Sequence, residues 1–328
     1  MNILYFTSDA FTSVAAVSIV SLFENNKDAV EINVYIIDDG ISESNRNLLN
    51  DMVRKYHRKV YYIPAPDPSE FFNFLFKSRY QMGHSYMRMC IGSLLPEGME
   101  KVLCLDSDTL VTGNIRELWE LEMGDNILAG VADCVNVKAF KHQFMLDADD
   151  IYCNAGMFLV NLKVWREKGV EQKICQTIKA HNGNIFFFEQ TLMNYACKGK
   201  IIKLEAKYNS YTLFYALTFK NLIRWRRPTN FYSEAEVDEA KKDSRIIHFT
   251  RNFYMTSRPW VENCDHPLTE MYRRYKKLTP WKEISPDNRP AKKKLQYKFM
   301  HCIPQSLLAS IVNVMYNDIR PLMRWKNE

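Results

Sequence analysis

Residues 101–111 read Lys-Val-Leu-Cys-Leu-Asp-Ser-Asp-Thr-Leu-Val, an apolar run that carries two carboxylates, Asp106 and Asp108, in its middle. Such a run predicts a buried strand, where an unpaired charge is costly. Either the strand ends at these aspartates, at the edge of a sheet, or the aspartates hold a cation. Residues two apart in a strand point to the same face, so both carboxylates can face one ion.

Segments typical of strands and helices alternate on the N-terminal side of this run. The alternation predicts an α/β fold, a parallel sheet with helices on both faces, in which ligands bind at the carboxyl ends of the strands. We expect residues 12–25 to form a helix with Thr12 or Ser13 as its N-cap. The other segments are expected strands at 2–7, 30–39, 59–65 and 101–108, and expected helices at 42–58 and 84–96.

Composition limits the class of protein. The chain has 328 residues, 47% of them hydrophobic and 13% aromatic, which is enough for a large core and argues against disorder. Eight cysteines are scattered without a Cys-x-x-Cys pair, which favours reduced thiols and a cytoplasmic location. The first residues lack the basic segment of a signal peptide, and the uncharged stretch 10–23 is too short to span a bilayer.

The positive charge is concentrated at one end of the chain. Residues 289–328 contain eight Lys or Arg and two acidic residues, a net charge of +6, which equals the formal charge of the whole chain. Within this region, Pro304 and Pro321 bracket a short apolar helix flanked by basic residues. The pattern predicts a tail that docks on an anionic membrane surface, or that packs on the rest of the protein or on another subunit. No nucleic-acid motif accompanies the charge.

An isolated Asp-x-Asp is more often a strand end than a site, so its setting matters. Oxygen ligands suit Mg²⁺ or Mn²⁺, and an added imidazole tilts the choice toward Mn²⁺. Aspartate-based phosphatases also place Asp-x-Asp after an apolar strand, with a threonine two residues on. Here Thr109 follows one position early, and the motif lies deep in the chain, so this alternative ranks lower.

Several motifs occur in one order along the chain: ILYFTSD, Tyr86-Met87-Arg88, LDSDTLV, GDNILAGVAD, YCNAGMFLVNLKVWRE, FFFEQTLMN, and IIHFT followed by RPW. Taken together, from residue 1 to about 281, the sequence resembles glycosyltransferase family 8, the retaining nucleotide-sugar transferases. The resemblance implies a Rossmann-like, nucleotide-sugar-binding α/β fold of the GT-A type. It also implies a UDP-sugar donor and a divalent ion, Mn²⁺ or Mg²⁺, that bridges the donor's diphosphate.

The resemblance assigns residues to the ion and to the nucleotide. Asp106, Asp108 and His248 match the family's metal ligands, and Arg258 lies near a phosphate-binding lysine of relatives. Arg251 stands where a glycine is common. The remaining implied donor-binding residues are Thr7, Ser8, Asp9 and Phe11 at the uridine, Arg88 and Asn154 at the sugar, and Ser107 between the two aspartates.

Catalytic positions follow from the same resemblance. Asp133, Glu189 and Gln190 match the family's sugar-binding positions, with Asn154 in an expected Asn-Ala-Gly turn. Retention demands attack from the face that the diphosphate leaves. A double displacement would need Glu189 as nucleophile, because Gln190 cannot serve as one. Front-face attack, with Glu189 and Gln190 stabilising the oxocarbenium-like centre, is the interpretation that we favour.

The expected organisation is a catalytic domain at 1–288, with an aromatic and basic acceptor-side region at about 207–243, followed by a basic amphipathic tail at 289–328. We expect transfer of galactose or glucose from UDP-sugar to a saccharide or lipid-linked glycan, at the inner face of the membrane. A catalytically weak nucleotide-sugar-binding module is the alternative.

Overall fold

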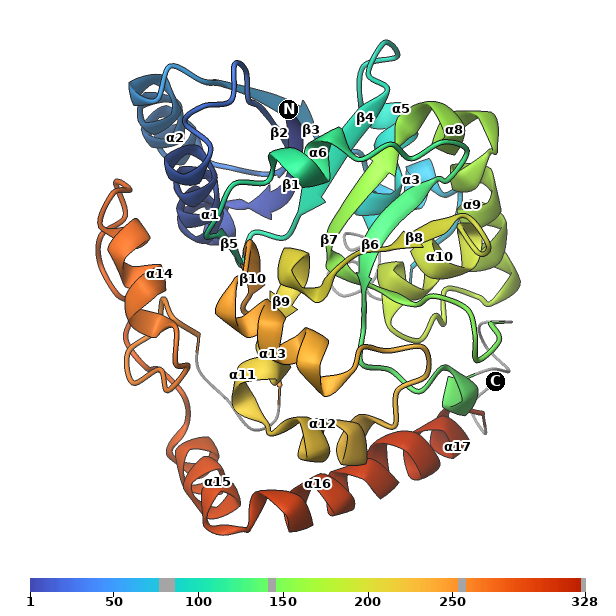
Figure 1. Ribbon diagram of the computed structural model, residues 1–328. Helices are drawn as coiled ribbons and strands as arrows, with labels where there is room; N and C mark the ends of the chain where they lie inside the picture. Colours follow the sequence, from blue (N-terminus) through green and yellow to red (C-terminus); the bar gives the residue numbers. More distant parts are fainter. Residues whose placement is uncertain (77–85, 141–145, 253–257, 326–328) are drawn as a thin grey trace.

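The computed structural model describes residues 1–76, 86–140, 146–252 and 258–325 (Figure 1). Its main sheet has the strand order β3-β2-β1-β4-β7-β6-β8, and a smaller sheet has the order β5-β10-β9. The strands are β1 (Asn2–Ser8), β2 (Asn33–Asp39), β3 (Lys59–Pro64), β4 (Lys101–Leu105), β5 (Thr109–Val111), β6 (Leu128–Ala132), β7 (Cys153–Asn161), β8 (Ile201–Lys203), β9 (Ser210–Tyr211) and β10 (Ile246–His248).

The strand order explains where a ligand would bind. The chain proceeds from β1 outward to β2 and β3, then returns to place β4 on the other side of β1. The sheet therefore has a topological switch point between β1 and β4. In open α/β sheets, ligands bind at such a point, outside the carboxyl ends of the strands.

The predicted α/β fold is confirmed, but the sheet is mixed instead of purely parallel. Strand β7 runs antiparallel to both of its neighbours, β4 and β6. A parallel neighbour needs a crossover connection, usually a helix. The described part of the β6–β7 connection contains only a short 3₁₀ turn at Val137–Phe140, and the chain returns in the opposite direction.

Helices cover both faces of the sheet (Figure 1). One apolar cluster joins the sheet to α1 and α2, and a second joins it to α5, α8, α9 and α10. The helices are α1 (Thr12–Asn25), α2 (Glu43–Lys55), α3 (Pro68–Phe71), α5 (Ile91–Leu94), α6 (Arg116–Glu120), α8 (Leu162–Glu167), α9 (Val170–Ala180), α10 (Phe188–Ala196), α11 (Leu213–Ala216), α12 (Phe219–Arg226), α13 (Glu234–Lys242), α14 (Thr269–Lys276), α15 (Ala291–Cys302), α16 (Gln305–Asn313) and α17 (Arg320–Trp325).

Two local expectations on helices were wrong in detail. Helix α1 has the expected bounds, but its N-cap is Phe11, and the Thr12 hydroxyl instead donates to the Ser8 carbonyl at 3.1 Å. The helix expected at 84–96 begins outside the described residues. Its described part is a 3₁₀ turn at Met87–Met89 followed by α5, because the Cys90 backbone leaves helical geometry.

The C-terminal helices lie along the lower edge of the molecule in Figure 1, and α16 packs against α12 and the main apolar core. Ala309 of α16 is 1% exposed and joins the main apolar core. The Gln305 side chain donates to the Ala216 carbonyl at 3.0 Å and accepts from Asn221 Nδ2 at 2.8 Å. These contacts agree with the packed-helix alternative for α16. None of the helices in the described part of the chain is long and apolar enough to span a bilayer.

Candidate active site

Asp106 and Asp108 lie in the tight turn between β4 and β5, and not within a strand as expected. The Thr109 amide donates to the Asp106 carbonyl at 3.1 Å and closes the turn. The Ser107 hydroxyl donates to the Phe6 carbonyl at 3.1 Å, which ties the turn to β1. The turn, and not the alternation of a strand, brings both carboxylates to one point.

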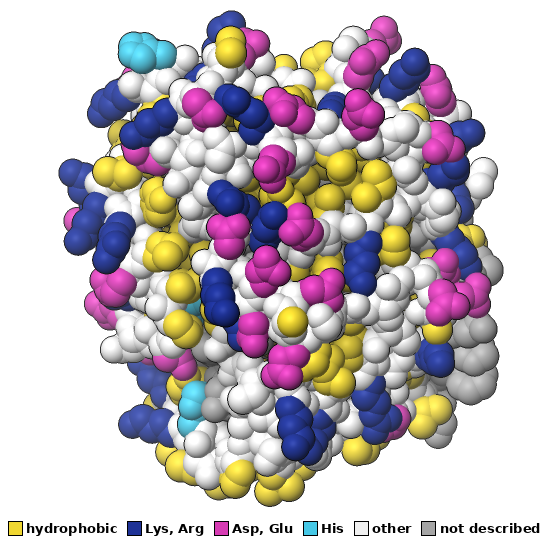
Figure 2. Space-filling view, in the orientation of Figure 1, with side chains coloured by type: hydrophobic (Ala, Val, Ile, Leu, Met, Phe, Trp, Pro, Cys, Tyr) yellow, Lys and Arg dark blue, Asp and Glu magenta, His cyan; other side chains and the backbone are white. Residues whose placement is uncertain are grey.

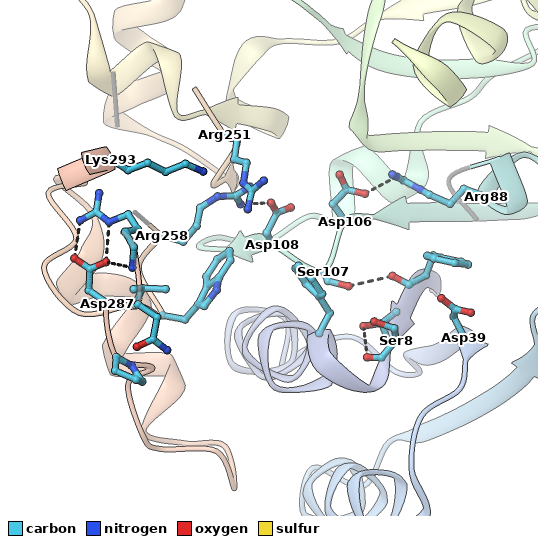
Figure 3. Close-up of a pocket in the computed structure, with 18 of the residues that line it drawn as sticks. Ser8, Asp39, Arg88, Asp106, Ser107, Asp108, Arg251, Arg258, Asp287 and Lys293 are labelled. Carbon is cyan, nitrogen blue, oxygen red and sulfur yellow. Dashed lines mark hydrogen bonds and ion pairs between the residues drawn. The ribbon is translucent and has the colours of Figure 1, made fainter. Parts of the chain in front are cut away.

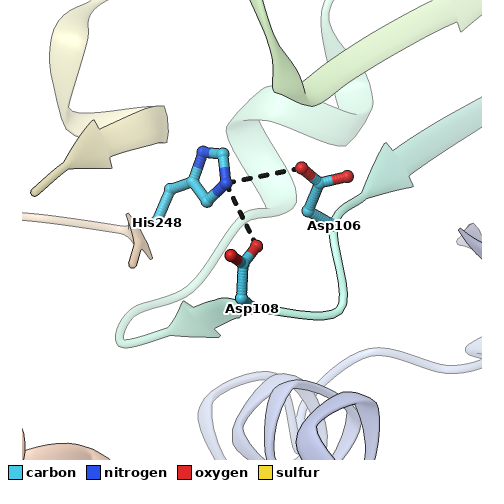
Figure 4. A group of neighbouring side chains, drawn as sticks. All are labelled: Asp106, Asp108 and His248. Carbon is cyan, nitrogen blue, oxygen red and sulfur yellow. Dashed lines mark ion pairs between the residues drawn. The ribbon is translucent and has the colours of Figure 1, made fainter. Parts of the chain in front are cut away.

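His248 completes a three-residue cluster with these aspartates (Figure 4). It ends β10, which pairs with β5 so that His248 lies opposite Thr109. Its Nε2 atom is 3.1 Å from Asp108 Oδ1 and 3.4 Å from Asp106 Oδ2. Within the described residues, this is the one group of three or more His, Cys, Asp or Glu side chains with the spacing of a metal site.

A second layer of contacts orients the imidazole. Its Nδ1 atom lies 3.2 Å from Asn154 Oδ1, which also accepts from Asn209 Nδ2 at 3.0 Å. A Cβ atom at Gly156 would lie 2.0 Å from His248 Cε1, so the ring fits only beside a glycine. Partners that fix the ring of a metal-binding histidine are a common feature of such sites.

Cations of the chain neutralise the two aspartates. Arg88 contacts Asp106 at 2.5 Å, and Arg258 contacts Asp108 at 2.5 Å. Burial would raise the pKa of Asp108, but His248 and Arg258 lower it below its ordinary value. Burial would lower the pKa of His248, but Asp108 and Asp106 raise it to about 9. The positive charges of Arg88, Arg258 and His248 thus offset the negative charges of the two aspartates.

The residues assigned to sugar binding form a connected network behind the aspartates. Arg88 donates to the Ala155 carbonyl at 2.6 Å and lies 3.7 Å from Glu189. Gln190 Nε2 donates to Asp133 Oδ2 at 2.8 Å, and Asn154 Nδ2 lies 3.3 Å from the same oxygen. Asn154 lies inside β7, and not in the expected Asn-Ala-Gly turn, because the strand already begins at Cys153, which pairs with Ala132 of β6. Glu189 lies in the first turn of α10, as expected.

A cavity of about 980 Å³ opens beside the cluster (Figure 3). Of the predicted site residues, it is lined by Thr7, Ser8, Phe11, Arg88, Asp106, Ser107, Asp108, Glu189 and Arg258. The predicted site residues Asp9, Asp133, Asn154, Gln190 and His248 are not among its lining residues. The Asp9 carboxylate accepts from the Ser42 amide at 2.8 Å and from Asn45 Nδ2 at 2.7 Å, at the start of α2.

Sequence reasoning missed several residues of this site. Asp39 lines the cavity from the carboxyl end of β2, a position that the strand pattern could have indicated. Trp260 lines it from the segment after Arg258, which the RPW motif marked without a role for the tryptophan. Residues 286–290 and Lys293 also line it, and no sequence pattern linked this distant segment to the aspartates.

Comparison with known proteins agrees with this architecture. The sequence profile described as Glycosyl transferase family 8 matches residues 2–264. A Haemophilus influenzae protein is 30% identical over 212 residues, which make up 64% of this chain and 63% of that protein, so less than two thirds of that relative is spanned. An Escherichia coli lipopolysaccharide 1,2-glucosyltransferase is 24% identical over 298 residues, 89% of this chain and 82% of that one.

Solved structures show the same fold. The structure of a galactosyltransferase, LgtC, in complex with donor and acceptor sugar analogs superposes with a TM-score of 0.69 at 22% identity, covering 90% of this chain and 100% of that one. The fold is therefore of the GT-A type, as the motifs predicted. With the family profile matching most of the chain, we conclude that this protein belongs to glycosyltransferase family 8.

Proposed function

We propose that the protein is a retaining hexosyltransferase that moves galactose or glucose from a UDP-sugar onto a saccharide or a lipid-linked glycan. One observation carries the proposal: the two aspartates of the Asp106–Asp108–His248 cluster line a cavity of about 980 Å³ in a family 8 chain. Nothing in the family match supports the aspartate-based phosphatase. A nucleotide-sugar-binding module with little catalytic activity is the remaining alternative.

The donor set fits a divalent metal ion. Two carboxylates and one imidazole offer ligand atoms that all lie within 4.8 Å of one another, and such oxygen and nitrogen ligands suit Mn²⁺ or Mg²⁺. A bound ion would supply Lewis-acid stabilisation of the charge that develops on the diphosphate. Asp106, Asp108 and His248 would hold it.

We assign the residues that line the cavity to different parts of the donor. Arg258, which is held on Asp108, is placed to bind a pair of diphosphate oxygens through its planar guanidinium. Thr7, Ser8 and Phe11 line the end assigned to the uridine, and Phe11 is 48% exposed, so its ring is accessible for stacking on a base. Asp9 remains a predicted uridine contact, although its carboxylate accepts hydrogen bonds from Ser42 and Asn45 at the start of α2.

At the sugar end, the arrangement favours front-face attack over a double displacement. Burial raises the pKa of Glu189 to about 7, although the Arg88 charge lowers it, so the carboxyl group is partly protonated near neutral pH. A protonated carboxyl group is a poor nucleophile. We infer that Glu189 and Gln190 orient the sugar, that Asp133 holds Gln190 in place, and that the leaving phosphate accepts the acceptor's proton.

We assign acceptor binding and membrane contact to the C-terminal part of the chain. The aromatic and basic region 207–243, which contains β9 and α11–α13, is the proposed acceptor side. Exposed apolar side chains recur at helical spacing along 305–322, opposite the buried Leu308 and Ala309. We call these residues the apolar stripe: Leu307, Ile311, Val314, Met315, Ile319 and Leu322.

The composition around the apolar stripe favours an anionic membrane surface as its partner. Helix α15 adds the exposed Leu295 and Phe299, and the exposed Lys292 and Lys298 lie close to them in the sequence. Figure 2 shows hydrophobic side chains along the lower edge of the molecule, with Lys and Arg close by, where α15 and α16 lie in Figure 1. Apolar side chains flanked by lysines suit an interface of acyl chains and anionic headgroups. We therefore propose peripheral attachment at the cytoplasmic face.

The proposed donor site is tested by titrating UDP into the protein with and without Mn²⁺. Binding should require Mn²⁺ and should weaken at least about 100-fold in the Asp106→Asn/Asp108→Asn variant, because the ion loses both carboxylates. Asp51→Asn, an exposed acid on α2, is the matched control. Absence of UDP binding under either condition would refute the proposal.

Turnover separates the enzyme from the binding module. UDP-glucose and UDP-galactose should each be tested for hydrolysis, and the anomeric configuration of the first sugar product determined by NMR. A product that keeps the donor's configuration supports retention. Metal-dependent UDP binding without hydrolysis or transfer of either donor would favour the binding module.

A further inference from the structure

The beginning of the C-terminal tail forms one wall of the catalytic cavity. Pro286, Asp287, Asn288, Arg289, Pro290 and Lys293 line it together with the aspartate cluster. This segment is joined to the chain that follows Arg258: the Ser285 amide donates to the Trp260 carbonyl at 2.9 Å, and the Glu262 amide donates to the Ser285 carbonyl at 2.9 Å. The wall is therefore attached to the catalytic body next to the proposed diphosphate contact.

The turn that leads into α15 is held by the carboxylate of Asp287, whose side chain is 5% exposed. Arg289 donates to both of its oxygens, at 2.7 and 2.8 Å. Lys294 Nζ donates to the Asp287 carbonyl at 2.8 Å. The charges of Arg289 and Lys294 are thus engaged in shaping the turn, and Lys293 lies on its cavity side (Figure 3).

Two cations on this cavity differ from the others in having no ion pair among the described residues. Arg88 and Arg258 each contact an aspartate, whereas the side chains of Arg251 and Lys293 form no ion pair or hydrogen bond with any residue in the described part of the chain. Both are exposed at the mouth of the cavity. In Figure 3, Lys293 extends from α15 toward the side where Arg251 and Arg258 lie. Two like charges that face one cavity are stabilised by an anion between them.

The sequence of α15 also favours an anion near Lys293. Lys292, Lys293 and Lys294 occupy its first turn, and no acidic residue does. The positive end of the helix dipole disfavours lysines at this position. A local preference that is violated beside a site is characteristic of functional residues. Lys294 contacts Asp287, which leaves Lys293 as the lysine of this turn that lines the cavity.

We propose that Arg251 and Lys293 form an additional phosphate-binding pair of the active site, so that the tail supplies a ligand-binding residue. The inference rests on the proposed function, since it places a phosphate in the same cavity. The phosphate belongs either to the donor's diphosphate or to a separate anionic group that binds beside the occupied donor site. Because both side chains are exposed, their contribution is electrostatic and sensitive to salt.

The test compares Lys293→Ala, Lys293→Arg and Arg251→Ala with the wild type, with Lys292→Ala as the matched control. Lys292 occupies the same helical turn, is exposed, and does not line the cavity. UDP is first titrated in the presence of Mn²⁺ at low and high salt. Inorganic phosphate is then titrated into protein saturated with UDP and Mn²⁺.

Each outcome decides one point. If the pair binds the donor diphosphate, Lys293→Ala and Arg251→Ala weaken UDP about tenfold at low salt and less at high salt, and Lys293→Arg restores binding. If it binds a separate anion, UDP affinity is unchanged, and the two alanine variants lose phosphate binding to the saturated protein. If Lys293→Ala and Arg251→Ala bind UDP and phosphate as Lys292→Ala does, the inference is wrong, but the proposed donor site is unaffected. Wild-type protein that binds no UDP refutes the proposed function itself.

Discussion

Glu189 shows how the site changes the chemistry of a single carboxyl group. It lies in the first turn of α10 with its side chain 18% exposed, 3.7 Å from Arg88, and partial burial outweighs the arginine so that its pKa rises to about 7. The folded state therefore holds a proton that the unfolded chain releases near pH 4.5. Stability from this group is fully present below about pH 4.5 and is lost as the pH rises through 7.

Replacing Glu189 by Gln should therefore stabilise the protein at pH 8, by roughly 1–3 kcal/mol, and have little effect at pH 4.5. The amide keeps the shape of the side chain and removes the buried charge. Thermal melting of both proteins from pH 4.5 to 8 measures the difference. Equal melting temperatures across that range would contradict the raised pKa. Glu120→Gln, at the end of α6, serves as the control.

At the scale of elements, the helices of the tail have two different faces. Leu308 and Ala309 are buried against the body, and the apolar stripe on the other side is exposed. A helix that packs through one face and exposes apolar residues on the other has a second surface available for a partner. The tail can thus be both part of the body and the proposed membrane contact.

The triple substitution Leu307→Gln/Ile311→Gln/Met315→Gln should lower binding to phosphatidylserine-containing vesicles at least tenfold. Each of these side chains loses apolar area that would enter the acyl region. Co-sedimentation with vesicles measures the effect, and Val30→Gln/Leu278→Gln removes exposed apolar residues elsewhere as a control. A triple variant that sediments like the wild type would show that the apolar stripe does not contact lipid.

At the scale of the whole molecule, part of the chain beyond the predicted boundary at residue 288 packs on residues that precede it. Ala309 joins the main core, and Asn317 Nδ2 donates to the Trp225 carbonyl at 2.8 Å. Gln305 bonds to groups around the start of α12. We expect the described part of the tail from 305 onward to unfold together with the catalytic body.

Gln305→Ala combined with Asn317→Ala should lower the melting temperature of the whole protein by several degrees. The substitutions leave backbone groups at Ala216 and Trp225 without these partners, at a cost of roughly 1–3 kcal/mol. Calorimetry should show one transition in both proteins, and Gln296→Ala on the exposed α15 is the control. A separate, low-temperature transition for the tail would mean that it folds independently.

Much of the fold could be read from local patterns. Strands β1 to β4 and helices α1 and α2 formed close to the ranges that the sequence pattern predicted, although the cap predicted for α1 was wrong. The direction of β7 could not be read, because strand direction depends on the path of the connection. Nor could the placement of residues 286–293, whose contacts with the cavity join positions far apart in the sequence.

The sequence by itself determined the residue types of the candidate site, the order of its motifs and the charge of its tail. Apolar runs and short-range signals carry that information, since they act between near neighbours. Only the tertiary structure decided which side chains meet. It paired β10 with β5 to bring His248 to the aspartates, used Gly156 to admit its ring, and placed Lys293 on the cavity. Such encounters depend on long-range packing, which no local pattern encodes.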